Sequence, residues 1–126
     1  MIRVLIIDDD LAFRRALAKH LERAGYDVLQ ASDGDAGMRE CQRHPVDLVV
    51  VDIFMPRQGG LQTIGGLRRE WPAMKIVAMS GVKSAGSLDV EKHAVALGAD
   101  RFVTKPFEAG TLVALVATLL EERRAP

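Results

Sequence analysis

The sequence predicts a single α/β domain built on a five-stranded parallel sheet. Short β-branched runs alternate with longer segments in which apolar residues recur every three or four positions. Two of the short runs, residues 4–7 and 48–51, are continuously apolar, as expected for central parallel strands buried on both faces. Strand and helix patterns that alternate in this way indicate parallel strands joined by right-handed helical crossovers.

Five segments have the length and composition of strands. They are Arg3 to Ile7, Asp27 to Ala31, Leu48 to Val51, Lys75 to Met79, and Arg101 to Thr104. The first helical stripe lies within residues 13–24 and is followed by Gly25, a plausible stop signal, and the last lies within residues 112–120. His20 falls on the inner side of the first helix, where we expect a partly buried structural histidine.

Length and composition fit one soluble domain over residues 1–126. Apolar residues make up 48% and charged residues 27% of the chain. Lys plus Arg and Asp plus Glu both number 17, so the formal net charge is zero. Nucleic-acid binding usually requires a basic excess, and we therefore expect no direct nucleic-acid partner.

The N-terminal apolar run is too short for a signal peptide or a membrane span, so we expect a cytoplasmic protein with no membrane partner. Six residues follow the last helical stripe, and a complete chain would therefore carry no output domain. Cys41 is the only cysteine. We expect it to be a small buried residue, with a reactive thiol as the alternative.

Polar side chains follow four of the predicted strands, at what should be one edge of the sheet. Each has an ordinary explanation on its own: an acid could cap the first helix, a serine could belong to a loop, and a lysine could be a solvated charge. These residues are Asp8, Asp9 and Asp10 after the first strand, Asp52 after the third, Ser80 after the fourth, and Lys105 after the fifth.

Their joint occurrence predicts a phosphoacceptor site. Asp52 follows an aliphatic run and lies near two other carboxylates, which would repel it unless a cation were bound. Such a cluster suits Mg²⁺, and a carboxylate held there can become an acyl phosphate. The ammonium group of Lys105 would neutralise charge on the transferring group, and the hydroxyl of Ser80 could donate a hydrogen bond to it.

The sequence resembles the receiver domain of bacterial two-component response regulators. The resemblance covers essentially the whole chain and rests on residues 4–10, residues 47–56, Ser80-Gly81, and residues 98–107. It implies a flavodoxin-like, doubly wound sheet with strand order 2-1-3-4-5. It also implies a cis bond between Lys105 and Pro106, although cis bonds are only about 5–6% of X–Pro bonds in general.

The resemblance assigns a role to each polar residue. Asp52 corresponds to the phosphorylated residue and Asp9 to a direct Mg²⁺ ligand. Asp8 would contribute mainly through water, and the backbone carbonyl of Phe54 would be a further metal contact. Lys105 corresponds to the lysine that contacts the phosphoryl group.

Two further positions correspond to the family's switch. Ser80 takes the place of the hydroxyl residue, more often Thr, that moves toward the phosphoryl group. Phe102 corresponds to the aromatic residue that turns inward when the hydroxyl moves. Phe102 lacks a tyrosine hydroxyl, so any switching would depend on its packing.

The function implied is that of a signalling switch. A phosphohistidine of a sensor histidine kinase or phosphotransfer protein would donate the phosphoryl group. The readout would be binding to a downstream protein or to a second copy, through residues 92–107 and the last helix. The domain would modify itself and would not be a turnover enzyme.

Some positions depart from the family pattern. Phe54 and Val82 are apolar where relatives often carry polar groups that place the hydrolytic water, so we expect slow self-dephosphorylation. The stretch of residues 81–87 is longer than usual for the fourth loop, and its Gly and Ser content predicts an irregular segment.

Two other function classes fit parts of the sequence. Asp8 and Asp10 form an Asp-x-Asp pattern, as in phosphatases of the haloacid-dehalogenase type, but Ala12 stands where that family expects a hydroxyl residue. A pseudo-receiver, which binds partners without phosphorylation, would usually lack the acceptor, the acidic pair or the lysine. This chain has all three.

Overall fold

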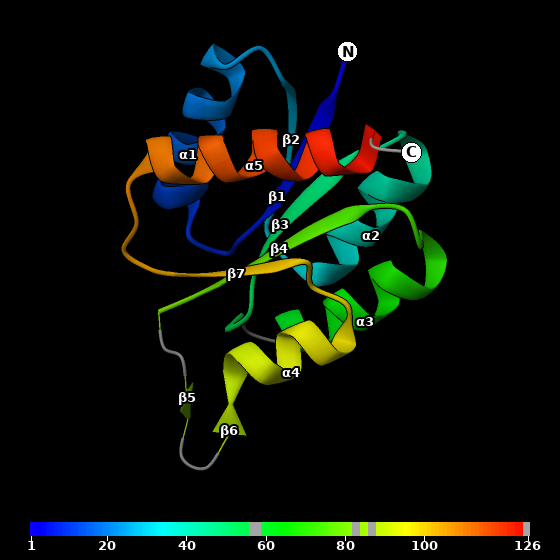
Figure 1. Ribbon diagram of the computed structural model, residues 1–126, viewed down its shortest axis with the longest axis vertical. Helices are drawn as coiled ribbons and strands as arrows, with labels where there is room; N and C mark the ends of the chain where they lie inside the picture. Colours follow the sequence, from blue (N-terminus) through cyan, green and yellow to red (C-terminus); the bar gives the residue numbers. More distant parts are fainter. Residues whose placement is uncertain (56–58, 82–83, 86–87, 125–126) are drawn as a thin grey trace.

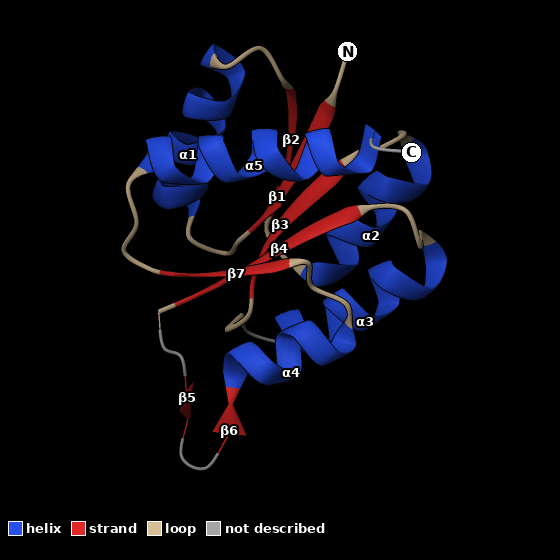
Figure 2. Ribbon diagram, in the orientation of Figure 1, coloured by secondary structure: helices blue, strands red, loops and turns tan. Residues whose placement is uncertain are grey.

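The computed structural model describes residues 1–55, 59–81, 84–85 and 88–124. Its main sheet has five parallel strands in the order β2-β1-β3-β4-β7 (Figure 2). The predicted strand order 2-1-3-4-5 and the flavodoxin-like fold are therefore confirmed. The strands of this sheet are β1 (Arg3–Ile7), β2 (Asp27–Ala31), β3 (Leu48–Asp52), β4 (Lys75–Ser80) and β7 (Arg101–Thr104).

Helices cover both faces of the sheet (Figure 1). Helices α1 and α5 lie on one face, and α2, α3 and α4 lie on the other. Their bounds are α1 (Leu11–Arg23), α2 (Gly34–Arg43), α3 (Gly60–Glu70), α4 (Val90–Leu97) and α5 (Ala109–Arg124).

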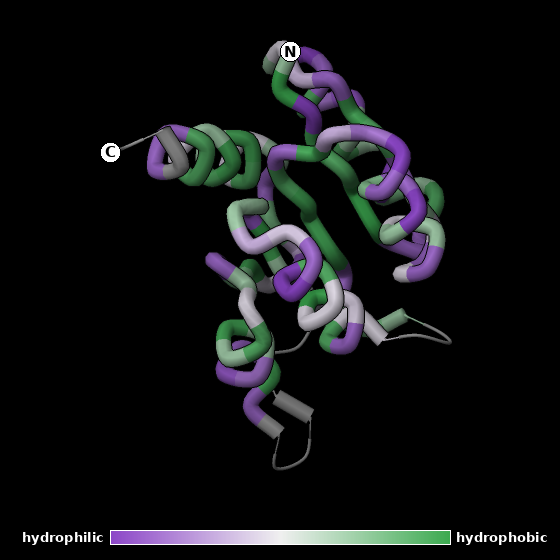
Figure 3. Tube along the Cα trace, turned by 90° about the vertical axis from the view of Figure 1, so that its right-hand side faces the viewer, coloured by the Kyte–Doolittle hydropathy of each residue, from purple (hydrophilic) through white to green (hydrophobic). Residues whose placement is uncertain are grey.

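The alternation of side chains along the central strands divides the core into two layers. In β1, Val4 and Ile6 pack toward α1 and α5, whereas Leu5 and Ile7 pack toward α2 and α3. All four side chains are fully buried. Figure 3 shows these strands as continuously hydrophobic segments between helices of mixed hydropathy. The continuous apolar runs therefore have the two-sided burial expected of them.

Aspartate residues start three of the helices. Asp10, Asp33 and Asp89 are the N-caps of α1, α2 and α4, and each side chain accepts a backbone N–H from the third residue that follows. Helix α1 ends at Arg23, and Gly25 just beyond it has a φ of 101°, as its predicted role as a stop signal requires.

Arg68 joins several elements at the edge of the sheet where the strands begin. Its guanidinium donates to the backbone carbonyls of Pro72, Met74 and Gly98 and pairs with Asp100 at 2.8 Å. The same carboxylate oxygen of Asp100 accepts the N–H of Ile76 at the start of β4. This network fixes β4 relative to β7, whose other ends carry the candidate functional residues.

Two expectations from the sequence were wrong, for the stretch after β4 and for His20, and a third, for Cys41, is confirmed. The stretch after β4, predicted to be irregular, contains an antiparallel hairpin of β5 (Ser84–Ala85) and β6 (Leu88–Asp89), strands too short to give a period-two pattern. His20 is exposed and not partly buried, because it lies at the margin of the α1 face that buries Leu17 and Leu21. Cys41 is buried, and burial raises the pKa of its thiol to about 12, as suits a structural residue.

Lys105 and Pro106 are joined by a cis peptide bond, as the resemblance implied. Val82 lies outside the described residues. Among the helices that the structure describes, none is both long and apolar enough to cross a membrane.

Candidate functional site

The polar residues that follow the strands gather at one edge of the sheet. Asp8 comes directly after β1, Asp52 and Ser80 are the last residues of β3 and β4, and Lys105 follows β7. Because these strands are adjacent and parallel, their carboxyl ends meet at the same place, which is where ligands bind in open α/β sheets.

Three carboxylates form an acidic cluster at this edge. One oxygen from each of Asp8, Asp9 and Asp52 lies within 4.8 Å of the others. Asp8 is fully buried and Asp52 is 7% exposed, whereas Asp9 is open to solvent. Three hard oxygen donors with one open side suit a divalent cation such as Mg²⁺, which keeps several waters and uses few carboxylates. The acidic cluster can therefore hold a metal ion.

Lys105 places its ammonium group inside this acidic cluster. Its Nζ lies 2.8 Å from Oδ2 of Asp8 and 3.8 Å from Oδ1 of Asp52. Its side chain is 21% exposed. The backbone N–H of Lys105 also donates to the carbonyl of Ser80 at 2.7 Å, which ties the lysine to the end of β4. Lys105 is therefore an ion-paired residue and not a solvated charge.

Asp10 has a different task from its two acidic neighbours. Its side chain accepts the N–H of Phe13 at 3.1 Å as the N-cap of α1. Its own N–H donates to Oδ1 of Asp8 at 2.9 Å, and Arg14 donates to the carbonyl of Asp8 at 2.8 Å. Asp10 is therefore the acid that caps the first helix, and Asp9 belongs to the acidic cluster.

Burial raises the pKa of Asp52 to about 6. Lys105 opposes this shift, the negative charges of Asp8 and Asp9 add to it, and a backbone hydrogen bond from Phe54 opposes it. The carboxylate of Asp52 is therefore costly to ionise without a further cation, and a bound metal ion would lower that cost.

Residues 4–117 match the family model described as the response regulator receiver domain. This chain belongs to that family. It is a receiver domain of two-component response regulators, as the sequence resemblance indicated.

Named relatives of this receiver domain are transcriptional regulators. It is 38% identical over 107 residues to the transcriptional regulatory protein KdpE of Mycobacterium tuberculosis, with 85% of this chain and 46% of that protein covered. It is 31% identical to the transcriptional regulatory protein CiaR of Streptococcus pneumoniae, with 96% of this chain and 52% of that protein covered. The chain thus spans about half the length of these relatives.

Solved receiver structures have the same fold. A CheY-like receiver domain protein from Methanospirillum hungatei aligns with a TM-score of 0.90 at 27% identity, covering 98% of this chain and 96% of that one. The chemotaxis protein CheY4 of Vibrio cholerae aligns with a TM-score of 0.86 at 26% identity, covering 94% of this chain and 98% of that one.

The other predicted residues of the receiver domain lie around the acidic cluster. Ser80 is fully buried at the end of β4, beside Thr104 of β7 in the sheet. Phe102 is half-buried and packs against the core layer under α2, α3 and α4. The side chain of Phe54 is 49% exposed two residues after Asp52. A metal contact through the Phe54 carbonyl stays a prediction.

Sequence reasoning missed two contributors to this edge. Phe13 was counted only as part of an apolar helix stripe, yet its ring lies 4.2 Å from Nζ of Lys105. Gly60 begins α3, and a Cβ atom there would overlap the carbonyl oxygen of Asp52. Neither contribution has a signal in the sequence, because Phe13 is one apolar residue of a helix stripe and the tight packing at Gly60 is seen only in the structure.

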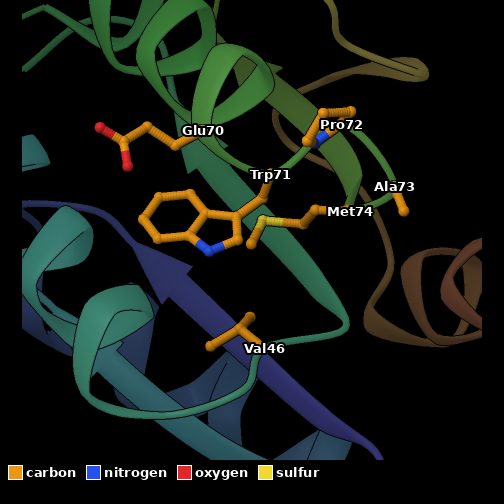
Figure 4. A pocket seen from close by; sticks show the side chains of 6 residues that line it. All are labelled: Val46, Glu70, Trp71, Pro72, Ala73 and Met74. Carbon is orange, nitrogen blue, oxygen red and sulfur yellow. The ribbon is translucent and has the colours of Figure 1, made fainter.

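The receiver domain also has a shallow apolar hollow far from the acidic cluster. It has a volume of about 270 Å³ and lies beside the α3–β4 turn and Val46, which precedes β3 (Figure 4). These residues come before β3 and β4, whereas the acidic cluster follows the strands. Its lining includes Trp71 and Met74 and contains none of the residues of the acidic cluster. The candidate site is therefore an open polar edge and not this hollow.

Proposed function

We propose that this receiver domain accepts a phosphoryl group on Asp52 from a phosphohistidine, with Mg²⁺ bound, and thereby changes how it binds a partner. The observation that carries the proposal is the position of Asp52: a buried carboxylate within 4.8 Å of Asp8 and Asp9 and 3.8 Å from the ammonium of Lys105. Membership of the receiver family supports the same assignment.

In the transfer step, Asp52 is the nucleophile. One of its carboxylate oxygens attacks phosphorus and forms a P–O bond as the P–N bond to the donor imidazole breaks. The imidazole nitrogen keeps the electron pair of the broken bond and takes up a proton, leaving a neutral histidine. With a pKa of about 6, most of Asp52 is already ionised at pH 7 and ready to attack.

Asp8, Asp9 and Asp52 would hold the metal ion, together with the predicted carbonyl of Phe54. Mg²⁺ bound there would neutralise the charge that gathers on the phosphoryl oxygens during transfer. The domain supplies these groups to modify its own side chain, and we therefore propose that it is not a turnover enzyme.

Lys105 supplies the remaining positive charge. Its ammonium is already paired with Asp8 and needs to move little to reach a phosphoryl oxygen on Asp52. The new phosphoryl group carries about 1.5 to 2 negative charges where the ionised carboxylate of Asp52 carried one, and this added charge would draw the ammonium from Asp8 toward the new group. Because Lys105 is bonded to the carbonyl of Ser80, this shift would act directly on the end of β4.

The switch would follow from Ser80 and Phe102. Ser80 would move its hydroxyl toward the phosphoryl group, and Phe102 would turn further into the core layer that it already contacts. The favoured arrangement would be one that the free domain populates as a minor state. Binding of a partner or of a second copy would read out that arrangement.

A partner surface is proposed along α4, β7 and α5. Val95 and Leu97 of α4 are large apolar side chains that are 51% and 40% exposed. Arg101 of β7 pairs with Glu122 of α5 at 2.9 Å, and this ion pair joins the other two elements of the surface. We propose a sensor histidine kinase or phosphotransfer protein as donor, a cytoplasmic location, and no direct contact of this domain with nucleic acid or membrane.

The test is intact mass spectrometry after incubation with Mg²⁺ and acetyl phosphate. Wild type should gain one phosphoryl group, whereas Asp52→Asn and a wild-type sample with EDTA should gain none. Absence of the adduct with acetyl phosphate and also with phosphorylated histidine kinases would contradict the proposal. It would favour a module that binds partners without phosphorylation.

A further inference from the structure

The aromatic ring of Phe13 lies against the ammonium group of Lys105. Lys105 Nζ is 4.2 Å from the ring centroid, well inside the distance of about 6 Å at which a ring face attracts a cation. Phe13 belongs to the first turn of α1 and Lys105 follows β7, so the contact joins segments from opposite ends of the chain.

The acidic cluster itself fixes the position of Phe13. Asp8 binds the ammonium of Lys105 through Oδ2 and accepts the N–H of Asp10 through Oδ1. Asp10 in turn accepts the N–H of Phe13. Asp8, Asp10, Phe13 and Lys105 therefore form a closed ring of contacts. The short segment from Asp8 to Phe13 therefore presents both a carboxylate and an aromatic ring face to the ammonium of Lys105.

A second aromatic residue attaches the lysine segment to α1. The rings of Phe13 and Phe107 are 5.8 Å apart with an interplanar angle of 83°, the edge-to-face arrangement that aromatic pairs favour. Phe107 lies two residues after Lys105. The segment that carries the lysine is thus held against α1 both at the ammonium and just beyond the backbone of Lys105.

We propose that Phe13 is a positioning residue whose ring holds the Lys105 ammonium beside Asp8 and Asp52. A lysine has a flexible four-carbon stem and three N–H donors. The ring face attracts its charge without offering a hydrogen-bond acceptor, so the donors remain available to Asp8 and to a phosphoryl oxygen. The consequence for phosphoryl transfer rests on the proposed function, whereas the placement of the ammonium does not.

A role for Phe13 in core packing alone would predict a different result. Phe13 also packs against the core layer under α1 and α5. If packing were its whole task, loss of the ring would affect the domain equally whether or not residue 105 carries a charge. A positioning role requires that the effect of losing the ring depend on that charge.

A double-mutant cycle separates the two roles. Phe13→Leu, which keeps apolar bulk, should lower the maximal rate of phosphorylation by acetyl phosphate about five- to tenfold, with the half-saturating concentration changed less than about twofold. Phe13→Tyr should retain the wild-type rate. In the Lys105→Met background, Phe13→Leu should alter the residual rate less than about twofold. Equal losses of phosphorylation rate in both backgrounds, in variants that urea unfolding shows to be folded, would overturn the proposal.

A spectroscopic measurement tests the placement without phosphorylation. In lysine-labelled protein, the ε-methylene protons of Lys105, assigned by their absence in Lys105→Met, should be shifted upfield by the ring current of Phe13. The shift should vanish in Phe13→Leu and persist in Phe13→Tyr. Unshifted protons in wild type would overturn the proposal even if Asp52 is phosphorylated. A shifted signal in a wild type that takes no phosphoryl group would uphold the placement and contradict only the proposed function.

Discussion

The ammonium of Lys105 lies 1 Å closer to Asp8 than to Asp52, at 2.8 Å from the first carboxylate and 3.8 Å from the second. The lysine therefore mainly neutralises the fully buried Asp8. Asp52 keeps a raised pKa of about 6 because this compensation is incomplete. The site is thus arranged to gain from an added cation and to release the lysine when new negative charge appears on Asp52.

Removal of the lysine charge should destabilise the metal-free domain. Lys105→Met leaves the buried Asp8 carboxylate without its ion pair, at an expected cost of about 2 kcal/mol in the free energy of unfolding. Urea unfolding in EDTA measures this cost. Lys19→Met, at an exposed position on α1, is the matched control and should change stability by less than about 0.5 kcal/mol. Equal effects of the two substitutions would contradict the account.

Magnesium should stabilise the folded domain through the acidic cluster. A ligand at 100 times its dissociation constant adds about 2.7 kcal/mol, so the midpoint of thermal unfolding should rise with Mg²⁺ and fall again with EDTA. Asp9→Asn should remove most of this rise. Asp35→Asn, an exposed acid on the first turn of α2, should leave it intact. The assignment of the cluster fails if Asp35→Asn loses as much of the rise as Asp9→Asn does.

The raised pKa of Asp52 makes stability depend on pH in a defined direction. Between pH 3.8 and about 6 the folded state binds more protons than the unfolded state, so unfolding becomes easier as pH rises. In EDTA, Asp52→Asn should exceed wild type by about 2–3 kcal/mol above pH 7. The difference should shrink as pH falls from about 6 toward 4. A difference that stays constant from pH 8 to pH 4 would show that Asp52 titrates normally.

Gly60 should be needed for the position of Asp52. A Cβ atom at residue 60 would overlap the Asp52 carbonyl oxygen and lie 2.5 Å from Cα of Ile53, and backbone atoms have little freedom to yield. Gly60→Ala should cost about 2 kcal/mol and slow phosphorylation. Gly110→Ala in α5 has open space around its Cβ position and should be neutral or slightly stabilising. Unchanged stability and rate in Gly60→Ala would rule out the close approach of α3 to β3.

Phe54 should prolong the phosphorylated state. Its half-exposed ring lies two residues after Asp52 and offers no group to orient a hydrolytic water. Phe54→Asn should therefore shorten the phosphoryl lifetime on the order of tenfold. Val95→Asn changes an equally exposed apolar residue on α4 and serves as the control. Loss of the phosphoryl group, followed by mass spectrometry after dilution into EDTA, measures both. Equal lifetimes for Phe54→Asn and wild type would contradict the expected slow hydrolysis.

The fold was predictable because its central strands are continuous apolar runs. The five predicted strands agree with those of the main sheet except that β3 and β4 extend one residue further, to Asp52 and Ser80, whereas the short strands β5 and β6 were not predicted. Those two residues pair with Met79 and Thr104 in the sheet although their polar side chains break the apolar pattern. Hydropathy therefore placed Asp52 and Ser80 one residue outside the strands that contain them.

Much of the site was also predictable, since parallel strands bring their carboxyl ends together. The contact of Phe13 with Lys105 was not, because an apolar residue in a helix stripe looks the same whether it meets the core or a charge. Helix capping by Asp10 also needed the structure, since Asp9 and Asp10 are equivalent in sequence. The catalytic and metal-binding roles of the gathered residues remain predictions that rest on this geometry.

The most direct test of the central claim is to locate the phosphoryl group. Wild-type protein phosphorylated with acetyl phosphate and Mg²⁺ is treated with borohydride, which reduces an acyl phosphate to an alcohol and so converts the modified aspartate to homoserine. Peptide sequencing by mass spectrometry should then find homoserine at position 52 and aspartate at positions 8 and 9. Homoserine at position 8 or 9, or an adduct that forms equally on Asp52→Asn, would contradict the account.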